Sequence, residues 1–225
     1  MKIVITGGAG FIGSSVAQLL KKDHKVTIFD HKKPTNEDCE FIQGDINDSK
    51  VVTDSIKDCD VIIHLAATLG VVYTEKNPIK TLDTNIIGTK NVLESCRLNN
   101  VRKIIFSSSS EVYGEPLKVP ISEIDKPIPI TNYGISKLAA EEYIKAYSKS
   151  YGFRYTILRL FNVYGDGQEN QWVVPEFVSQ AIKNQDITIH NAGLQVRAFC
   201  YVSDVCDAFR VVLENGDREI FNIGN

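Results

Sequence analysis

Short apolar runs alternate with segments of helical periodicity along most of this chain. The runs show no alternation with polar residues, as expected for strands buried on both faces of a parallel sheet. The predicted strands are Ile3 to Ile5, Val26 to Phe29, Asp60 to His64, Lys103 to Ser107 and Tyr155 to Leu158. This order predicts an α/β fold: a doubly wound parallel sheet with helices on both faces and all strand carboxyl ends along one edge.

The segments between these strands include two long predicted helices, Pro78 to Asn99 and Asn132 to Tyr151. The stretch from Glu115 to Thr131 contains four prolines and is predicted to be a long irregular loop. Long loops inside compact domains are more often functional than idle, so we expect this one to border the active site.

The pattern loosens after Gly165, where shorter elements follow one another. We predict a helix near Val174 to Lys183, a strand at Ile187 to Ile189 and a helix from Ser203 to Glu214. The expected organisation is therefore a first domain of residues 1–165 and a smaller substrate-binding region of residues 166–225.

The composition is that of an ordinary globular protein, and it argues against nucleic acid and membranes as partners. The 225 residues are 43% hydrophobic and 24% charged, and the net charge of −3 gives no basic field for nucleic acid or for an anionic membrane. The most apolar stretch, Val61 to Tyr73, is interrupted by His64 and is too short to span a bilayer. The five cysteines are scattered and odd in number, which favours reduced thiols in the cytoplasm over disulfides and gives no metal site.

The first predicted strand runs directly into a glycine-rich turn, Thr6 to Gly13, with glycines at positions 7, 10 and 13. Such a turn lets a pyrophosphate approach bare backbone at the amino terminus of the next helix, which is a dinucleotide site. The second strand ends at Asp30, about 20 residues past the glycines, where a carboxylate can accept hydrogen bonds from a ribose. Asp30 favours NAD. His31 and the two lysines after it leave NADP as the minor alternative.

Tyr133 and Lys137 lie four residues apart, on one face of a predicted helix. By itself this spacing is typical of solvated neighbours. The glycine turn, a serine cluster at Ser107 to Ser110 and this pair occur in the order that is typical of one group of enzymes. The chain resembles the extended branch of the short-chain dehydrogenase/reductase superfamily, the NAD-dependent nucleotide-sugar epimerases and dehydratases, over essentially its whole length.

This resemblance implies a Rossmann-type fold whose C-terminal substrate-binding region is small and apparently incomplete, since the family normally continues past Asn225. It implies NAD as the cofactor, with Asp45 reaching the adenine, His64 packed in the core and Asn85 as structural support. The residues implied to contact NAD are Gly7, Gly10, Phe11, Ile12, Gly13, Asp30, Asp45, Ile46, Leu65, Ala66, Ala67, Ser107, Tyr133 and Lys137.

The resemblance also implies a mechanism through a transient 4-keto sugar. Tyr133 takes the proton of a sugar hydroxyl as hydride leaves for the nicotinamide, and Lys137 and the cationic nicotinamide ring together are expected to lower the pKa of this phenol from about 10. Ser109 orients the reacting hydroxyl. The residues implied to contact a nucleotide-diphosphate sugar are Ser109, Ser110, Asn162 and Arg197.

Glu111 occupies the position at which a glutamate removes the C5 proton in the family's 4,6-dehydratases, and the family's decarboxylases carry a Ser-Glu pattern in the same loop. The resemblance therefore favours 4,6-dehydratase or decarboxylase chemistry. The alternative for Glu111 is a surface carboxylate that caps the following turn. Three other functions stay open: a UDP-sugar 4-epimerase, an NAD(P)H-dependent keto-sugar reductase and a non-catalytic dinucleotide-binding protein. The two long helices resemble those that form an intersubunit bundle in the family, which predicts a homodimer.

Overall fold

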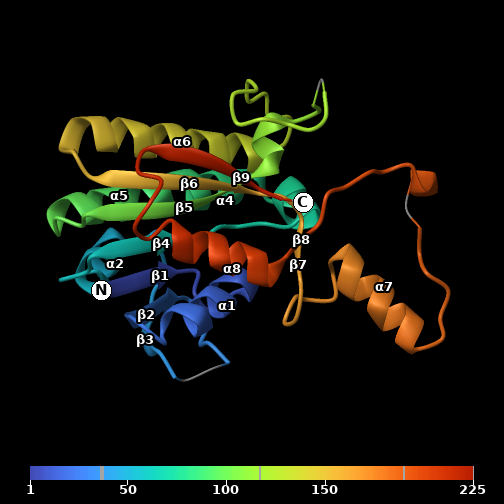
Figure 1. Ribbon diagram of the computed structural model, residues 1–225, viewed down its shortest axis with the longest axis horizontal. Helices are drawn as coiled ribbons and strands as arrows, with labels where there is room; N and C mark the ends of the chain where they lie inside the picture. Colours follow the sequence, from blue (N-terminus) through green and yellow to red (C-terminus); the bar gives the residue numbers. More distant parts are fainter. Residues whose placement is uncertain (36–37, 117, 190, 225) are drawn as a thin grey trace.

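A parallel sheet of seven strands forms the centre of the computed structural model, which describes residues 1–35, 38–116, 118–189 and 191–224 (Figure 1). The strand order is β3-β2-β1-β4-β5-β6-β9, and it reverses direction between β1 and β4. Ligands bind outside the carboxyl ends of the strands at such a reversal. The strands are β1 (Lys2–Thr6), β2 (Lys25–Asp30), β3 (Glu40–Gln43), β4 (Val61–His64), β5 (Lys103–Ser109), β6 (Arg154–Leu160) and β9 (Glu219–Ile223).

Helices cover both faces of this sheet, as the alternation in the sequence predicts. Two of them, α1 (Phe11–Leu20) and α8 (Val202–Val211), pack on one face against a cluster that includes Ile3 and Ile5. The other face carries α2 (Ser49–Ser55), α5 (Gly88–Leu98) and α6 (Asn132–Tyr151), whose cluster includes Val4 from the same strand. Successive residues of β1 therefore point to opposite layers, the period of two that a strand imposes.

The long helix predicted from Pro78 to Asn99 contains a π-helical turn. It comprises α4 (Pro78–Leu82), the turn η1 (Asp83–Ile87) and α5 (Gly88–Leu98), and a short helix α3 (Val71–Lys76) precedes it. A π turn inserts one extra residue and often marks a functional position. Here it buries Asn85, which is 2% exposed.

The final third of the chain differs from the prediction in two ways. No strand forms at Ile187 to Ile189, where the backbone is irregular and the two isoleucines are 47% and 66% exposed. An apolar run becomes a strand only where a neighbour completes its hydrogen bonds, and this segment crosses open surface instead. After residue 160 the chain forms three strands that were not predicted: β7 (Val163–Tyr164) and β8 (Cys200–Tyr201), which pair with each other, and β9. Helix α7 (Val173–Ile182) lies close to its predicted place.

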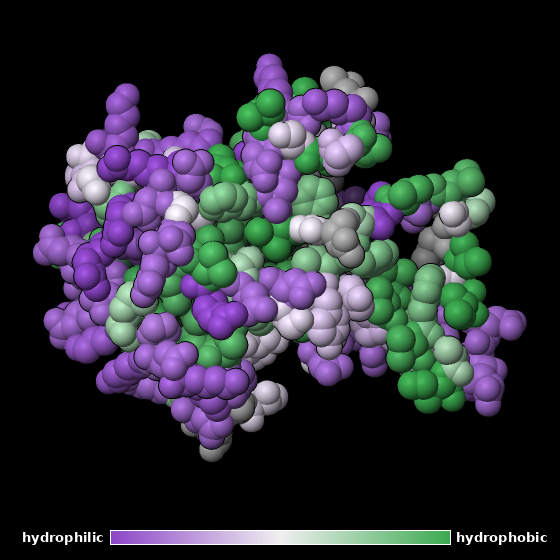
Figure 2. All heavy atoms as spheres, viewed as in Figure 1, coloured by the Kyte–Doolittle hydropathy of each residue, from purple (hydrophilic) through white to green (hydrophobic). Residues whose placement is uncertain are grey.

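The predicted division at residue 165 is not a boundary of the sheet. Strand β9 pairs with β6 along Thr156 to Leu160, and α8 packs against α1, so residues after 200 belong to the same layers as the first 165. Helix α7 and the strap that follows it, residues 183–189 and 191–199, lie apart from those layers (Figure 1). Exposed apolar side chains gather over them (Figure 2).

The five cysteines are all buried free thiols. None of the described helices combines the length and the apolarity needed to cross a bilayer.

Candidate functional site

A cavity of about 1110 Å³ opens at the carboxyl edge of the sheet. It is bounded by the turns after β1, β2, β4 and β5, by the amino end of α6 and by the chain from Leu160 to Val174. The predicted site residues that line it are Gly7, Gly10, Phe11, Ile12, Gly13, Asp30, Asp45, Ile46, Leu65, Ala66, Ala67, Ser107, Ser109, Ser110, Glu111, Tyr133, Lys137 and Asn162. The topology thus brings together residues that are distant in the sequence.

The glycine turn is packed too tightly for a larger residue at position 7 or 13. A Cβ on Gly13 would lie 2.2 Å from the carbonyl oxygen of Gly7, and a Cβ on Gly7 would lie 2.6 Å from the backbone nitrogen of Ala66. Gly7 also has a φ of +73°, which favours glycine. The amino end of α1 therefore meets the cavity as backbone N–H groups, with Gly10 as a cap that has no side chain.

Asp30 lies at the end of β2 with 8% of its surface exposed. Its Oδ2 accepts from the N–H of Ala9 at 3.0 Å, and its Oδ1 accepts from the N–H of Lys32 at 3.0 Å. These bonds fix the carboxylate beside the glycine turn, where its remaining lone pairs suit ribose hydroxyls and its charge opposes a phosphate. The bare helix terminus and this carboxylate together fit a dinucleotide without a 2′-phosphate.

Lys137 is buried on α6, one turn after Tyr133, with 2% of its surface exposed. Its Nζ donates to the carbonyl oxygen of Ser107 at 2.8 Å and lies 5.7 Å from the centre of the Tyr133 ring. Burial lowers the pKa of Lys137 to about 7, and the carboxylate of Glu141 opposes this shift. A small change in its surroundings therefore decides whether Lys137 is charged near neutral pH.

The protein groups by themselves raise the pKa of Tyr133, so the expected lowering depends on the cationic nicotinamide ring and stays a prediction. Burial raises the pKa of Tyr133, the negative charge of Glu111 raises it further, and only a hydrogen bond with Ser109 opposes them. The ammonium of Lys137 donates to the Ser107 carbonyl and not to the phenol. Its downward effect on the Tyr133 pKa is therefore smaller than the upward effect of removing water from the phenol.

Glu111 lies in a 3-10 turn, η2 (Ser110–Tyr113), that follows β5 directly. Its Oε2 accepts from the hydroxyl of Thr131 at 2.7 Å, and its N–H donates to the Oγ of Ser109 at 3.2 Å. The carboxylate is thus held in the cavity against the amino end of α6, and it does not cap its own turn. Sequence reasoning missed Thr131; its signal is the helix N-cap position two residues before Tyr133.

Two buried polar residues, His64 and Asn85, hold together the segments that form the site. His64 is fully buried between the hydroxyls of Thr6, at 2.6 Å, and Thr89, at 2.9 Å, and burial lowers its pKa to about 3. Asn85 donates to the carbonyl of Thr68 at 3.0 Å and to the hydroxyl of Ser136 at 2.9 Å. The π turn therefore ties the loop after β4 to α6.

Of the two residues predicted to contact a diphosphate, Asn162 lines the cavity and Arg197 does not. Asn162 lines the cavity, has a φ of +26° and donates to the carbonyl of Ala198 at 2.8 Å. Arg197 is exposed on the strap, where its Nη1 bonds to the carbonyl of Val196 at 3.0 Å, and it is not among the lining residues. The aromatic side chains of Tyr164, Trp172 and Phe199, which sequence reasoning did not single out, line that end of the cavity.

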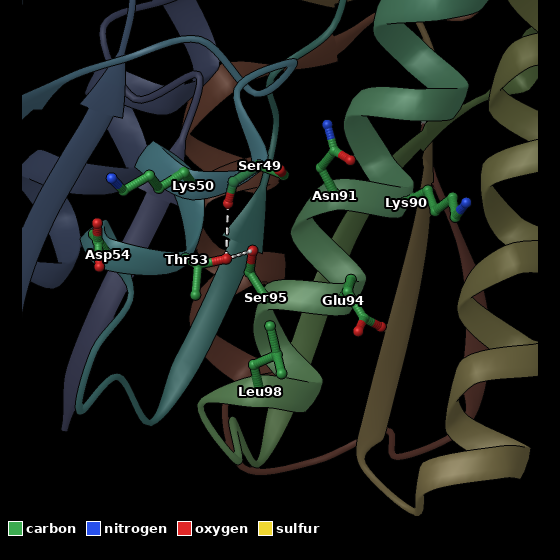
Figure 3. A pocket seen from close by; sticks show the side chains of 9 residues that line it. All are labelled: Ser49, Lys50, Thr53, Asp54, Lys90, Asn91, Glu94, Ser95 and Leu98. Carbon is green, nitrogen blue, oxygen red and sulfur yellow. Dashed lines mark hydrogen bonds between the residues drawn. The ribbon is translucent and has the colours of Figure 1, made fainter.

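A second hollow of about 500 Å³ lies between α2 and α5 (Figure 3). In it, the hydroxyl of Thr53 donates to the carbonyl of Ser49 at 2.7 Å and lies 2.8 Å from the hydroxyl of Ser95. Because its hydroxyls bond to one another and to the helix backbone, we place the functional site in the larger cavity. Among the residues that the structure describes, no group of three metal-ligating side chains is found.

Comparison with known proteins agrees with this geometry. Residues 3–224 match the model of the NAD dependent epimerase/dehydratase family. The chain is 41% identical to a putative UDP-glucose 4-epimerase of Methanocaldococcus jannaschii, over 99% of this chain and 76% of that protein. It is 34% identical to the dTDP-D-glucose 4,6-dehydratase of Dictyostelium discoideum, over 99% of this chain and 58% of that protein. It is also 34% identical to UDP-glucuronic acid decarboxylase 5 of Arabidopsis thaliana, over 100% and 70%.

Solved structures show the same similarity. The crystal structure of UDP-glucose 4-epimerase from Thermotoga maritima with UDP-glucose has a TM-score of 0.96 and 36% identity, covering 100% of this chain and 77% of that one. The UDP-glucose 4-epimerase of Thermus thermophilus in complex with NAD has a TM-score of 0.93 and 30% identity, over 100% and 78%. The expected fold, the NAD cofactor and the expected enzyme class are confirmed: this chain belongs to the NAD-dependent epimerase/dehydratase family.

Proposed function

We propose that this protein transforms a nucleotide-diphosphate sugar through a transient 4-keto intermediate and keeps its NAD through the cycle. The observation that carries this proposal is the convergence of Ser109, Glu111, Tyr133 and Lys137 on the cavity beside the glycine turn. A protein that only binds a dinucleotide needs the turn and Asp30 but has no use for a phenol, an ammonium and a carboxylate at the far end.

The roles of the residues follow from their chemistry. Ser109 orients the C4 hydroxyl, and Tyr133 accepts its proton. When bound, NAD supplies the hydride acceptor and a positive ring that favours the phenolate. That charge is needed, because burial and Glu111 raise the pKa of Tyr133. Lys137 assists as an ammonium, which its pKa of about 7 permits at neutral pH and below.

Glu111 favours a second proton transfer, at C5. A 4-keto group acidifies the C5 hydrogen, and the Glu111 carboxylate is held in the cavity by Thr131 at 2.7 Å. 4,6-Dehydration uses such a base. In the related decarboxylation of a uronic acid, the 4-keto intermediate is a β-keto acid that loses CO2 from C5, and the same group in its protonated form can return a proton to C5. A UDP-sugar 4-epimerase is the second candidate, because the Methanocaldococcus and Thermotoga proteins carry that name.

The phosphate end of the substrate is placed at the aromatic end of the cavity. Asn162 lines that end, whereas Arg197 points along the exposed strap, so of the two predicted contacts we retain Asn162. The buried free thiols suit a reducing compartment, and we place the protein in the cytoplasm.

We further propose a homodimer built on one face of α5 and α6. Ile135 and Tyr143 are 44% and 38% exposed on α6, and Ile87 and Leu98 are 50% and 53% exposed at the ends of α5. Two copies of this face can bury one another in a four-helix arrangement, which suits an isologous interface.

The deciding experiment incubates the purified protein with UDP-, GDP-, CDP- and dTDP-sugars in deuterated water. Deuterium at C5 or C6 indicates Glu111 chemistry, which Glu111→Gln removes while hydride transfer at C4 continues. Label-free inversion at C4 assigns a 4-epimerase. Stoichiometric consumption of added NADH or NADPH contradicts the proposal and assigns a reductase, and binding without turnover of any sugar assigns a dinucleotide-binding protein.

A further inference from the structure

Glu141 and Arg159 form a buried ion pair in the core, next to the segments that carry the candidate catalytic groups. Glu141 is 0% exposed and Arg159 is 2% exposed. The Nε of Arg159 donates to Oε1 of Glu141 at 3.0 Å, and its Nη2 donates to Oε2 at 2.7 Å, so the pair is bidentate. Buried pairs of this kind contribute little net stability compared with apolar residues of similar volume. Stability alone therefore does not explain why this pair occupies the core.

The carboxylate of Glu141 joins two segments that carry catalytic candidates. It lies on α6 one turn beyond Lys137, and its Oε1 also accepts from the hydroxyl of Ser108. Ser108 immediately precedes Ser109 at the end of β5. Glu141 thus holds the serine strand at a fixed distance from the helix that carries Tyr133 and Lys137.

The guanidinium of Arg159 reaches the third segment, the turn that carries Glu111. Its Nη1 donates to the hydroxyl of Tyr113 at 2.7 Å, and the group lies 4.8 Å from the centre of that ring. Tyr113 is two residues beyond Glu111, and its hydroxyl donates to Oδ1 of Asn222 on β9 at 2.8 Å. One ion pair therefore connects all of the segments from which the catalytic candidates project.

We propose that Glu141, held by Arg159, is a positioning residue that keeps the Lys137 ammonium charged and sets the serine strand against α6. This inference rests on the proposed role of Tyr133 and Lys137 in proton transfer.

The charges around Lys137 support this role. Burial lowers the pKa of Lys137, and Glu141 is the carboxylate that raises it again. On β4, His64 is neutral near pH 7 because burial lowers its pKa to about 3. Beyond these groups, Lys137 meets the Ser107 carbonyl and the Phe106 ring of β5, the neutral phenol of Tyr133 on its own helix and, behind that phenol, Glu111 of η2. Glu141 is therefore the negative charge that acts on Lys137 from within the core.

The test compares Glu141→Gln with Glu142→Gln, a neighbour whose exposed carboxylate pairs with Lys145. The titration of Lys137 is followed by NMR of lysine labelled with ¹³C at Cε, which needs no substrate. We expect Glu141→Gln to lower the midpoint by about one pH unit, a roughly tenfold change in the protonation equilibrium. The alkaline limb of single-turnover NAD reduction, followed at 340 nm, moves with it. Glu142→Gln changes neither.

Glu141→Gln leaves the buried Arg159 without its counter-charge, so a second variant guards against loss of folding. Glu141→Leu combined with Arg159→Met removes both charges and keeps the volume. We expect it to fold but to retain the lowered Lys137 midpoint and the slowed NAD reduction. An unchanged Lys137 midpoint in either folded variant overturns the inference. If no nucleotide sugar reduces the bound NAD in the unaltered protein, the proposed function fails, while the titration still tests Glu141.

Discussion

Thr131 and Glu111 share one hydroxyl group between a helix cap and a candidate base. The Oγ1 of Thr131 donates to Oε2 of Glu111 at 2.7 Å and accepts from the N–H of Gly134 at 2.9 Å. The same atom therefore begins α6, the helix of Tyr133, and fixes the carboxylate that faces the cavity. Removing this hydroxyl affects a fold contact and a chemical contact together.

Thr131→Val is expected to separate the two proton transfers. Without the donor, Glu111 loses its fixed position, so deuterium incorporation at C5 falls roughly tenfold, equivalent to about 1.4 kcal/mol of barrier. Hydride transfer at C4 changes much less. Loss of the cap destabilises the protein by about 1 kcal/mol, measured by urea unfolding. Thr131→Ser keeps the hydroxyl and is the control; equal C5 exchange in the valine and serine variants contradicts the role of Thr131.

Alanine substitutions at Gly13 and Gly10 are expected to affect different properties, stability at Gly13 and NAD affinity at Gly10. A Cβ on Gly13 meets the Gly7 oxygen at 2.2 Å, whereas on Gly10 it meets that atom at 3.3 Å. Gly13→Ala therefore lowers the free energy of unfolding by more than about 2 kcal/mol. Gly10→Ala keeps its stability but loses NAD affinity, because the added methyl group occupies the path of the pyrophosphate. Urea unfolding and calorimetric titration with NAD measure the two effects, and loss of stability in both variants argues against this distinction.

Lys137→Met is expected to stabilise the protein while abolishing turnover. The pKa of Lys137 lies at about 7 against a usual value near 10.5, so the folded protein binds the proton less tightly than the unfolded chain. Stability therefore rises with pH between about 7 and 10.5, and at neutral pH the buried lysine costs on the order of 4 kcal/mol. The methionine variant removes this cost and the pH dependence, as chemical unfolding at several pH values will show. A less stable variant contradicts the prediction.

His64 is expected to cause part of the acid denaturation. Its pKa is about 3 in the folded protein against a usual value of 6.5, so the unfolded chain binds the extra proton between these limits. Stability therefore falls as the pH drops from 6.5 towards 3, by up to about 1.4 kcal/mol per pH unit. His64→Asn removes this slope although it weakens packing at every pH. The free energy of unfolding of both proteins, measured between pH 7 and pH 4, tests this prediction. The same pH dependence in His64→Asn as in the unaltered protein contradicts it.

The proposed dimer is tested by introducing a carboxylate on the exposed face of α6. Ile135 is 44% exposed on α6, whereas Ile124, which is 91% exposed, lies on the loop before it. Ile135→Asp is expected to give a monomer in sedimentation velocity at micromolar concentration, because a carboxylate cannot be buried there unpaired. Ile124→Asp leaves the dimer intact. An unaltered protein that sediments as a monomer rules out the interface.

The sequence predicted the elements whose signals are local. Helix α6 was predicted with its observed bounds, Asn132–Tyr151, because the helical period of its residues can be seen in the sequence itself. Strand β9 was missed: Glu219–Ile223 mixes polar and apolar residues, and it becomes a strand only by pairing with the distant β6. The π turn was also missed, since one extra residue leaves the apolar period almost unchanged.

The site was predictable to the same degree. Ser109, Tyr133 and Lys137, which motif order singled out, line the cavity because strand ends and helix starts meet at one sheet edge, while their roles stay predictions. The bonds that set their behaviour join residues with no sequence relationship, such as Glu141 with Arg159. The upward contribution of the protein groups to the Tyr133 pKa was not predicted, because it depends on how much water the fold removes.

The late position of β9 in the chain has a consequence for biosynthesis. Until residues 219–223 leave the ribosome, β6 presents an unpaired edge of amide and carbonyl groups for several seconds at about 5–20 residues per second. Edges of this kind recruit strands from other chains. Until β9 has been synthesised, this edge of β6 is therefore open to pairing with strands of other chains.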